Sequence, residues 1–221
     1  MLGRKYREGD AELKRAVTNV SHDLRTPLTS AAGYAGLLKK SGLTPKQAEY
    51  LSVIEGRISA MRRLTEELLA YSVAASDETE PVLAEVDIAA ALEDSLTQFY
   101  AAFEERGISP VIRIPEGKVM RVADNDALAR VFGNIISNAV RYSDGDFCVE
   151  MKENGEILFE NSASALDEVS AKRLFDRFFT VENARGSTGL GLSIAKLFVE
   201  RMNGSIGASW SEGRLCIRMK L

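Results

Sequence analysis

Two stretches of apolar residues with heptad spacing, near residues 13–38 and 51–68, constrain the fold of this chain more than any other feature. Four- and three-residue steps between apolar positions are typical of a coiled coil or helical bundle. Ser41-Gly42 interrupts the pattern, and Thr44-Pro45 supplies an N-cap and a proline at the first position of a second helix. One stripe per helix cannot close a core, so we expect two such hairpins to pair as a four-helix bundle in a homodimer. The stripes consist of Leu13, Val17, Val20, Leu24, Pro27, Ala31, Tyr34 and Leu38, then Leu51, Ile54, Ile58, Met61, Thr65 and Leu68, widened by Leu64 and Leu69.

Beyond this all-α hairpin, assigned to residues 1–75, we expect a linker at 76–85 and a second domain at 86–221. The linker assignment follows from the polar, acidic segment Ser76–Pro81. The pattern of the second domain predicts an α+β two-layer sandwich of antiparallel strands with helices on one face. Helices are predicted over 88–105, 124–141, 168–179 and 190–202, and strands over 108–114, 119–122, 147–151, 157–160, 205–211 and 214–221.

Charge and composition exclude several classes of function. The 221 residues carry a net charge of −4, so the chain has no basic field for nucleic acid. The two cysteines, Cys148 and Cys216, lie far apart in the sequence and fit reduced thiols of a cytosolic protein better than a disulfide. No apolar run reaches the roughly 18 residues that cross a bilayer, so we expect a cytoplasmic chain, with membrane attachment only through a segment outside it. The polar stretch after Met1 fits the cut end of a longer protein.

His22 is the only histidine. With Leu24 in the apolar stripe, His22 falls on the opposite face of its helix, where a lone histidine is usually a surface residue without function. Its neighbours favour function instead: Asp23 can orient the imidazole or accept its proton, and Thr26 shares its face one turn later. Pro27 loosens the helix at this point. A neutral imidazole nitrogen is nucleophilic near pH 7, which suits His22 to covalent catalysis.

The segment Asn19–Thr29, Asn-Val-Ser-His-Asp-Leu-Arg-Thr-Pro-Leu-Thr, resembles the H-box of the dimerisation and histidine-phosphotransfer domain of bacterial sensor histidine kinases. The resemblance implies that His22 is the phosphoacceptor and Asp23 the base. It places Thr26 at the position that supports dephosphorylation of a partner response regulator, whose receiver domain becomes an expected partner.

Asn134 and Asn138 stand four residues apart on one face of the helix predicted over 124–141, with Arg141 and Tyr142 one turn on. A carboxamide oxygen is a fair ligand for a hard cation, so Asn138 can hold Mg²⁺ between phosphates while Arg141 neutralises their charge. Two satisfied polar residues on a helix are the alternative interpretation. The segment Asn134–Ser143 resembles the N-box of the GHKL ATP-binding fold, which histidine kinases share with gyrase.

A glycine-rich segment, Gly186–Ile194, follows and opens a predicted helix. Glycines let backbone approach phosphates, and a helix N-terminus presents free N–H groups to them. The segment resembles the second glycine box of histidine kinases, and Arg173–Phe179 resembles their F-box, with Phe175 and Phe178 as core or hinge aromatics. The resemblance implies an ATP lid over 180–188. From these segments the expected nucleotide contacts are Arg177, Arg185, Thr188, Gly189, Leu190, Gly191 and Leu192.

One position departs from the family pattern. The first glycine box normally reads Asp-x-Gly-x-Gly and binds adenine through its aspartate, whereas here Asn161 is followed by Ala163 and Ala165. Asn161 keeps an acceptor oxygen but loses the charge, and its amide must be turned the right way. A neutral hydrogen bond in place of a charge-assisted one costs on the order of 1 kcal/mol of affinity. We expect ATP binding that persists but is weaker or tuned.

The leading hypothesis is therefore the cytoplasmic part of a sensor histidine kinase, which phosphorylates His22 with ATP and Mg²⁺ and transfers the group to a response regulator. A degenerate kinase that acts as a scaffold or phosphatase is the alternative, motivated by Asn161 and Thr26. A conformational ATPase clamp of the gyrase type fits the second domain but leaves the H-box unexplained. Whether His22 is phosphorylated in cis or in trans is not readable from the hairpin loop.

Overall fold

The computed structural model describes residues 24–74, 81–181 and 188–221. The chain forms two compact units, Met1–Thr79 and Glu80–Leu221. The division falls inside the acidic segment Ser76–Pro81. No helix among the described residues combines the length and apolar character needed to cross a bilayer.

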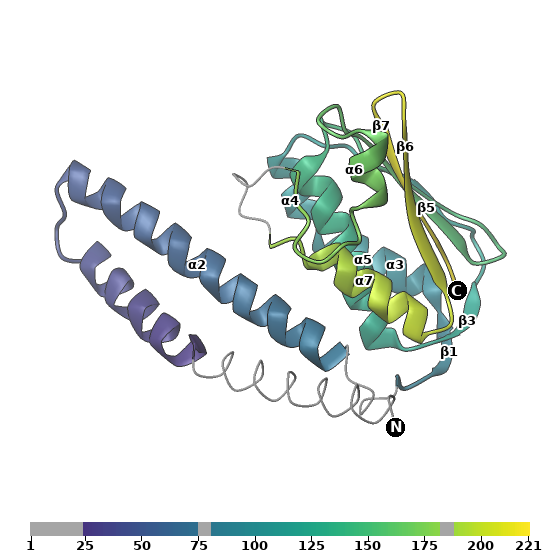
Figure 1. Cartoon of the computed structure of the whole chain (residues 1–221), viewed down its shortest axis with the longest axis horizontal. Coiled ribbons are helices and arrows are strands. Elements are labelled where there is room, and N and C mark those ends of the chain that lie inside the picture. The colour runs from purple at the N-terminus through teal and green to yellow at the C-terminus, as the bar shows by residue number, and fades with distance from the viewer. Residues whose placement is uncertain (1–23, 75–80, 182–187) are drawn as a thin grey trace, which may run out of the picture. The chain divides into compact units, whose positions relative to one another are not determined.

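The first unit is a helical hairpin (Figure 1). A helix over residues 24–39 turns back into α2 (Pro45–Ala74). The start of α2 is the predicted cap: the Gln47 backbone N–H donates to the Thr44 hydroxyl at 3.4 Å, and the Thr44 N–H donates to the Gln47 side-chain oxygen at 3.0 Å. An ion pair of 3.1 Å between Lys39 and Glu55 links the two helices.

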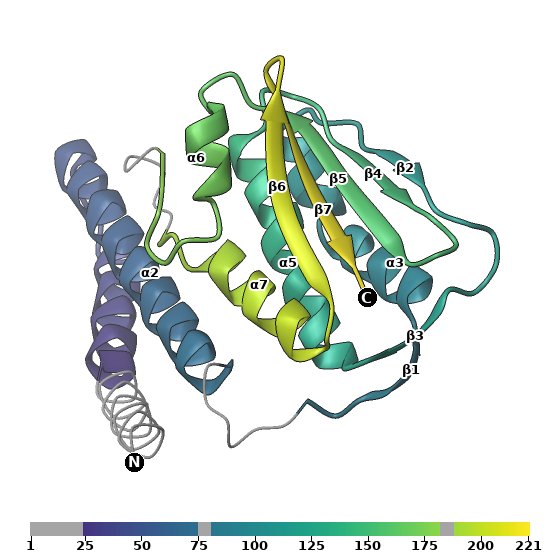
Figure 2. The same cartoon turned by 45° about the vertical axis from the view of Figure 1, so that its right-hand side comes forward.

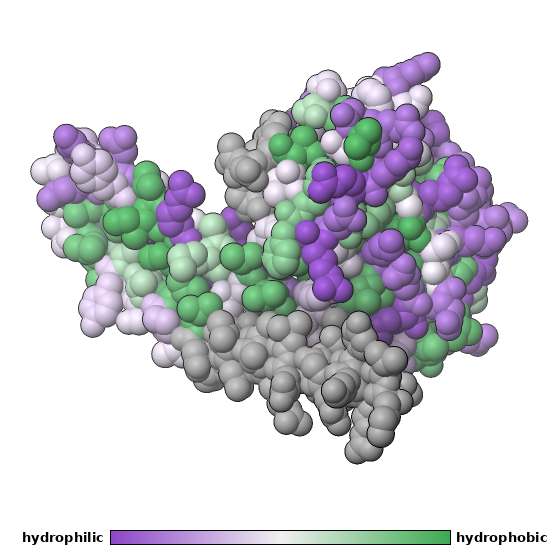
Figure 3. All heavy atoms as spheres, in the orientation of Figure 1, coloured by the Kyte–Doolittle hydropathy of each residue, from purple (hydrophilic) through white to green (hydrophobic). Residues whose placement is uncertain are grey.

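Most of the predicted apolar stripe that lies among the described residues stays exposed within a single chain. Leu28, Ala35, Leu51 and Thr65 are buried, and of these only Leu51 and Thr65 belong to the predicted stripe. The exposed stripe residues of the described hairpin include Leu24, Tyr34, Leu38, Ile54 and Met61. Apolar side chains accordingly gather on the surface of the hairpin (Figure 3). The hairpin therefore presents an apolar face that its own fold leaves uncovered.

The second unit is an α+β sandwich, as expected. Its elements are β1 (Ala84–Asp87), α3 (Ile88–Gln98), α4 (Tyr100–Glu105), β2 (Val111–Arg113), β3 (Met120–Ala123), α5 (Asn125–Tyr142), β4 (Cys148–Met151), β5 (Glu156–Ser162), α6 (Glu168–Lys172), α7 (Gly191–Arg201), β6 (Ser205–Ser211) and β7 (Arg214–Lys220). The main sheet has the order β2-β4-β5-β7-β6, and α3, α5 and α7 cover one of its faces (Figure 2).

The core lies between the sheet and these helices. In β5, buried Ile157, Phe159 and Asn161 alternate with half-buried residues, because successive side chains of a strand point to opposite faces. On α5 the buried residues recur at helical spacing, which turns one side of the helix to the sheet. They are Ala127, Leu128, Val131, Phe132, Ile135, Ile136 and Ala139.

Two predicted helices differ from those observed. The helix predicted over 88–105 breaks at Phe99, whose N–H donates three residues back to Leu96. The turn redirects the chain so that Phe103 stacks on Phe147, with ring centroids 5.3 Å apart. The helix predicted over 168–179 ends at Lys172, because the following residues form three-residue turns instead of α-helical bonds.

Two strand predictions also need correction. The sheet is not wholly antiparallel, since β2 pairs with β4 in parallel. The sequence patterns did not predict β1, in which Ala84 and Glu85, assigned to the end of the linker, pair with Ala123 and Val122 of β3. Asp87 fastens this ribbon to the sandwich by accepting hydrogen bonds from the Ala89 and Val119 N–H groups.

Candidate functional site

The polar residues of the predicted N-box lie along one side of α5. Asp124 caps this helix by accepting a 3.0 Å hydrogen bond from the Ala127 N–H. With the apolar side of the helix buried, the half-buried residues that remain include Asn134, Asn138, Arg141 and Tyr142. The four predicted residues therefore share a helix that the core holds rigidly.

Asn134 meets the start of α7. A Cβ atom added to Gly191 would stand 3.3 Å from the Asn134 side-chain oxygen. The residue before α7, Leu190, makes no side-chain cap, whereas Asp87, Asp124 and Asp167 cap α3, α5 and α6. An uncapped helix start leaves N–H groups available to an anion. Asn134 of the N-box and Gly191 of the glycine box thus lie next to each other in the structure.

Gly189 lies against the F-box. The N–H of Phe178 donates to the carbonyl of Gly189 at 3.0 Å. Gly189 has φ +69°, and a Cβ there would stand 2.6 Å from the Phe178 carbonyl carbon, so only glycine fits. This bond closes the base of the segment that the sequence assigned to the lid.

Phe178 is not a core aromatic. It is 59% exposed and has φ 61°, a conformation that costs about 1 kcal/mol or more for a residue with a side chain. Phe175, by contrast, packs half-buried against the core. Arg177, which precedes Phe178, is exposed.

Two predicted nucleotide contacts belong to the core. Leu190 is fully buried and Leu192 nearly so, which leaves only their backbone to face a ligand. The Thr188 hydroxyl accepts a hydrogen bond of 3.2 Å from the Leu190 N–H and orders the approach to α7.

Asn161 stands at the end of β5 on the face toward the helices. Its side chain is 5% exposed, and its Nδ2 donates to the Ser162 carbonyl at 2.9 Å. Two residues after Asn161, Ala163 donates its N–H to the Gly213 carbonyl at 2.7 Å, and its own carbonyl accepts from Trp210 Nε1 at 3.0 Å. Hydrogen bonds at both backbone groups fix the loop where the family pattern has glycines.

A polar cluster beside Asn161 went unrecognised in the sequence. Asp146 accepts from the Ser162 N–H at 2.6 Å and pairs with Arg214 at 2.8 Å, and Asp144 accepts from the Ser164 N–H at 2.7 Å. Partial burial raises the pKa of Asp146, but hydrogen bonds from Ser162 and Arg214 outweigh it and lower that pKa to about 2. The residues from Asp144 to Asp146 resemble an ordinary turn in sequence, and no local signal points to Arg214.

The remaining predicted residues lie elsewhere. His22, Asp23 and Arg185 fall outside the described residues. Thr26 belongs to the hairpin unit and is exposed. The helix over 24–39 continues through Pro27.

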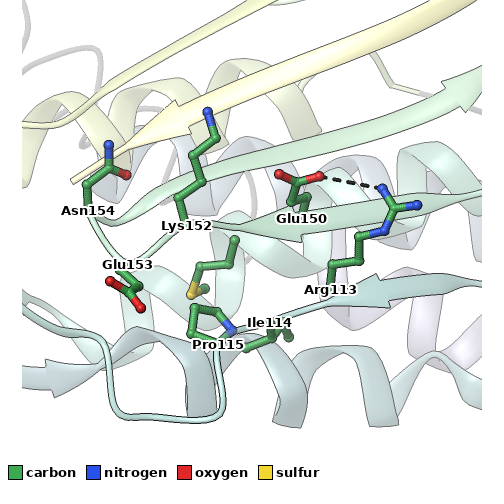
Figure 4. Close-up of a pocket in the computed structure, with 8 residues that line it drawn as sticks. Arg113, Ile114, Pro115, Glu150, Lys152, Glu153 and Asn154 are labelled. Atoms are coloured by element: carbon green, nitrogen blue, oxygen red, sulfur yellow. Dashed lines mark ion pairs between the residues drawn. The ribbon is translucent and has the colours of Figure 1, made fainter.

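An open pocket of about 660 Å³ is lined by other residues, all in the second unit (Figure 4). It sits beside the β4–β5 turn, where Arg113 pairs with Glu150 at 3.5 Å. None of the predicted nucleotide-binding residues lines it, so it does not belong to the candidate site.

Two family models match the chain. Residues 12–75 match the His Kinase A (phospho-acceptor) domain, and residues 123–221 match the ATPase family described as histidine kinase-, DNA gyrase B- and HSP90-like. The first match contains the H-box, and the second contains the N-box, F-box and glycine box.

Curated relatives align with most of this chain. Sensor protein kinase WalK of Staphylococcus haemolyticus is 34% identical over 222 residues, which cover 93% of this chain and 36% of that protein. Sensor histidine kinase YcbM of Bacillus subtilis is 27% identical over 221 residues, covering 93% of this chain and 70% of its own length. The chain spans about a third of the length of the Staphylococcus epidermidis and Staphylococcus haemolyticus WalK proteins.

Solved structures show the same fold. The crystal structure of full-length ShkA in complex with AMPPNP has a TM-score of 0.71 at 22% identity and covers 92% of this chain and 45% of its own. The histidine kinase AdeS of Acinetobacter baumannii has a TM-score of 0.63 at 20% identity, over 90% of this chain and 96% of its own. With the family matches, the sequence relatives and the juxtaposition of N-box and glycine box, the chain belongs to the bacterial sensor histidine kinases.

Proposed function

We propose that this chain uses ATP and Mg²⁺ to phosphorylate its own His22 and then passes the phosphoryl group to an aspartate of a response regulator receiver domain. One observation carries the proposal: the Asn134 side chain lies against Gly191 at the uncapped start of α7. A polar helix face beside a helix N-terminus without a side-chain cap is an arrangement that can bind the phosphates of a nucleoside triphosphate. The same chain carries the H-box.

In the proposed step, an imidazole nitrogen of His22 attacks the γ-phosphorus of ATP. An N–P bond forms, the bond from that phosphorus to the β,γ-bridging oxygen breaks, and ADP leaves. The imidazole proton passes to the Asp23 carboxylate. Such transfers depend on positioning and charge neutralisation. In the proposal, positioning and charge neutralisation come from the start of α7, from Arg141, and from the predicted contacts Arg177 and Arg185.

Asn138 is the proposed protein ligand of Mg²⁺. When bound, the ion neutralises phosphate charge during transfer. The half-buried carboxamide of Asn138 offers an oxygen ligand that suits a hard cation. Among the described residues no group of three or more His, Cys, Asp or Glu side chains could hold a metal. The ion would therefore arrive with the nucleotide phosphates, and we expect little Mg²⁺ binding without nucleotide.

We also propose that the chain is a homodimer through the hairpin. The exposed apolar face that includes Ile54 and Met61 supports this, because a second copy would cover it. ATP and receiver domains are cytoplasmic, so we place the chain in the cytoplasm, with membrane anchoring through a segment outside it.

Autophosphorylation with γ-labelled ATP and Mg²⁺ tests the proposal. We expect an acid-labile label that is absent in His22→Ala, which removes the only histidine. A mixture of His22→Ala with Asn138→Ala assigns the direction of transfer: label in the mixture requires that one chain phosphorylates its sister. A His22→Ala chain that labels as well as the wild type would overturn the proposal.

A phosphatase or scaffold is the second candidate, supported by exposed Thr26 and by Asn161. Absence of label together with dephosphorylation of a phosphorylated receiver domain that fails in Thr26→Ala would favour it over the kinase.

A further inference from the structure

The backbone of Ser162 is held at both of its polar groups. Its N–H donates to Asp146 Oδ1 at 2.6 Å, and its carbonyl accepts from the Asp144 N–H at 3.1 Å. The other oxygen of Asp146 accepts from Arg214 at 2.8 Å. Arg214 is also the register partner of Ser162 between β7 and β5. Asp146 thus ties the loop after α5 to both strands where β5 ends.

The Asp146–Arg214 pair remains charged at neutral pH. Hydrogen bonds from Ser162 and Arg214 overcome the effect of burial and keep the pKa of Asp146 low, and the Asp146 hydrogen bond raises the pKa of Arg214. A charge-assisted hydrogen bond is shorter and stronger than a neutral one. The N–H of Ser162 is therefore anchored to an ionised carboxylate.

The Ser162 carbonyl in turn orients Asn161. Only the nitrogen of a carboxamide can donate, so the 2.9 Å bond from Asn161 Nδ2 to this carbonyl fixes which way the amide faces. Oδ1 is then the atom that can accept a hydrogen bond from a ligand. An aspartate here would set a carboxylate oxygen against the Ser162 carbonyl oxygen, and two acceptors repel.

We infer that Asp146 and Arg214 are positioning residues for the nucleotide base, because they hold Ser162 so that Asn161 presents its oxygen to the ligand. The inference rests on the proposed nucleotide site. Adenine carries an amino donor at C6, whereas hypoxanthine carries a carbonyl acceptor there. A fixed acceptor selects the amino purine, and a carboxamide free to turn accommodates both.

The neighbouring loop supports this assignment. Ala163 is bound at its N–H by Gly213 and at its carbonyl by Trp210, so the chain after Asn161 is also fixed by β6 and by the turn between β6 and β7. The hydrogen bonds around Asn161 therefore suit an asparagine side chain, so its replacement of the family aspartate does not simply remove an adenine contact.

The test compares the affinities of ADP and IDP by titration calorimetry. We expect the wild type to prefer ADP by roughly fivefold or more, the equivalent of one hydrogen bond. Asp146→Ala and Arg214→Gln should each reduce the IDP-to-ADP ratio of dissociation constants toward one. Asn161→Asp should weaken ADP binding. Arg218→Gln, on the same strand as Arg214, removes an ion pair with Glu156 of β5; it is the matched control and should keep the wild-type ratio.

A second measurement needs no nucleotide. The Asn161 side-chain amide protons should exchange slowly with solvent in the wild type and faster in Arg214→Gln, which covers the case in which Asp146→Ala fails to fold. Wild-type ADP binding with an unchanged ratio in both variants would overturn the inference, as would tighter ADP binding by Asn161→Asp. A wild type that binds no ADP overturns the proposed function itself, and the inference with it.

Discussion

The Asn134 side-chain oxygen lies 3.3 Å from the position that a Cβ atom on Gly191 would occupy. The approach is tight enough that Gly191→Ala must displace the carboxamide by a few tenths of an ångström. We expect this variant to weaken ADP binding several-fold with little loss of stability, since the side chain that moves is only half-buried. Calorimetric titration and urea unfolding measure the two effects.

Gly133→Ala is the control for that substitution. Gly133 lies in the interior of α5 next to Asn134, and a Cβ there meets nothing within 4 Å. Replacing a glycine in the interior of a helix stabilises by about 0.5–1 kcal/mol. Unchanged ADP affinity in Gly133→Ala, beside a loss in Gly191→Ala, assigns the effect to the contact. Equal losses in both would contradict it.

Gly189→Ala should destabilise the second unit by more than conformation alone explains. Gly107 has nearly the same φ, +65° against +69°, but a Cβ on it meets nothing within 4 Å. Gly107→Ala therefore isolates the conformational cost of about 1–2 kcal/mol. The further loss in Gly189→Ala measures the clash with Phe178, and equal unfolding free energies would show that the Phe178 backbone yields freely.

Ile54→Glu should weaken dimerisation. Ile54 is 51% exposed on α2, and a charge buried in an apolar interface is costly. Ser52→Glu, an exposed position on the other side of the same helix, adds the same charge as a control. Light scattering should show a dimer for the wild type and Ser52→Glu and a smaller mass for Ile54→Glu. A dimer in all three would place the interface elsewhere.

Asp146 should contribute to stability at neutral pH and lose that contribution in acid. Its pKa of about 2 lies below the ordinary 3.8, so the contribution is present above 3.8 and is lost as the pH falls toward 2. The side chain is 42% exposed, and solvent screening limits the effect to about 1 kcal/mol. In urea unfolding, the difference in unfolding free energy between the wild type and Asp146→Ala should therefore shrink below about pH 4. A constant difference would argue against the low pKa.

Cys148 and Cys216 should not form a disulfide. Both are free, and Glu160 of β5 lies between them in register. Two strand spacings separate their Cα atoms by about 10 Å, beyond the roughly 7 Å that a disulfide spans. Burial raises the pKa of both thiols, which slows their modification. Intact mass after mild oxidation should show two reduced thiols, and loss of two hydrogens would contradict the sheet order.

The features predicted well from sequence are those with local signals. The Thr44-Pro45 cap, the period of α5 and the β6–β7 hairpin depend on residues close in the chain. The parallel pairing of β2 with β4 has no such signal, because α5 separates the two strands. The end of α6 was misplaced because the residues after Lys172 have an acceptable helical pattern, yet tertiary contacts draw them into turns.

The candidate site divides in the same way. Asn134 and Gly191 were found because each stands in a contiguous motif. Asp146 and Arg214 form their ion pair across 68 positions, and neither has a pattern around it. The sequence also suggested that Asn161 was a weakened aspartate, whereas the orientation of its amide is a property of the folded loop.

The pairing of Ser162 with Arg214 has a consequence for the folding rate. The F-box, α7 and β6 all lie in the chain between these register partners, so the centre of the sheet joins distant segments. Closing so long a loop costs about 3–4 kcal/mol of chain entropy before the strands reward it. The β4–β5 and β6–β7 hairpins are local and can form early, whereas the β5–β7 pairing forms after both hairpins. The elements assigned to nucleotide binding thus lie in the long segment between β5 and β7. Because pairing these two strands requires contacts distant in sequence, we expect this step to limit the folding rate of the second unit.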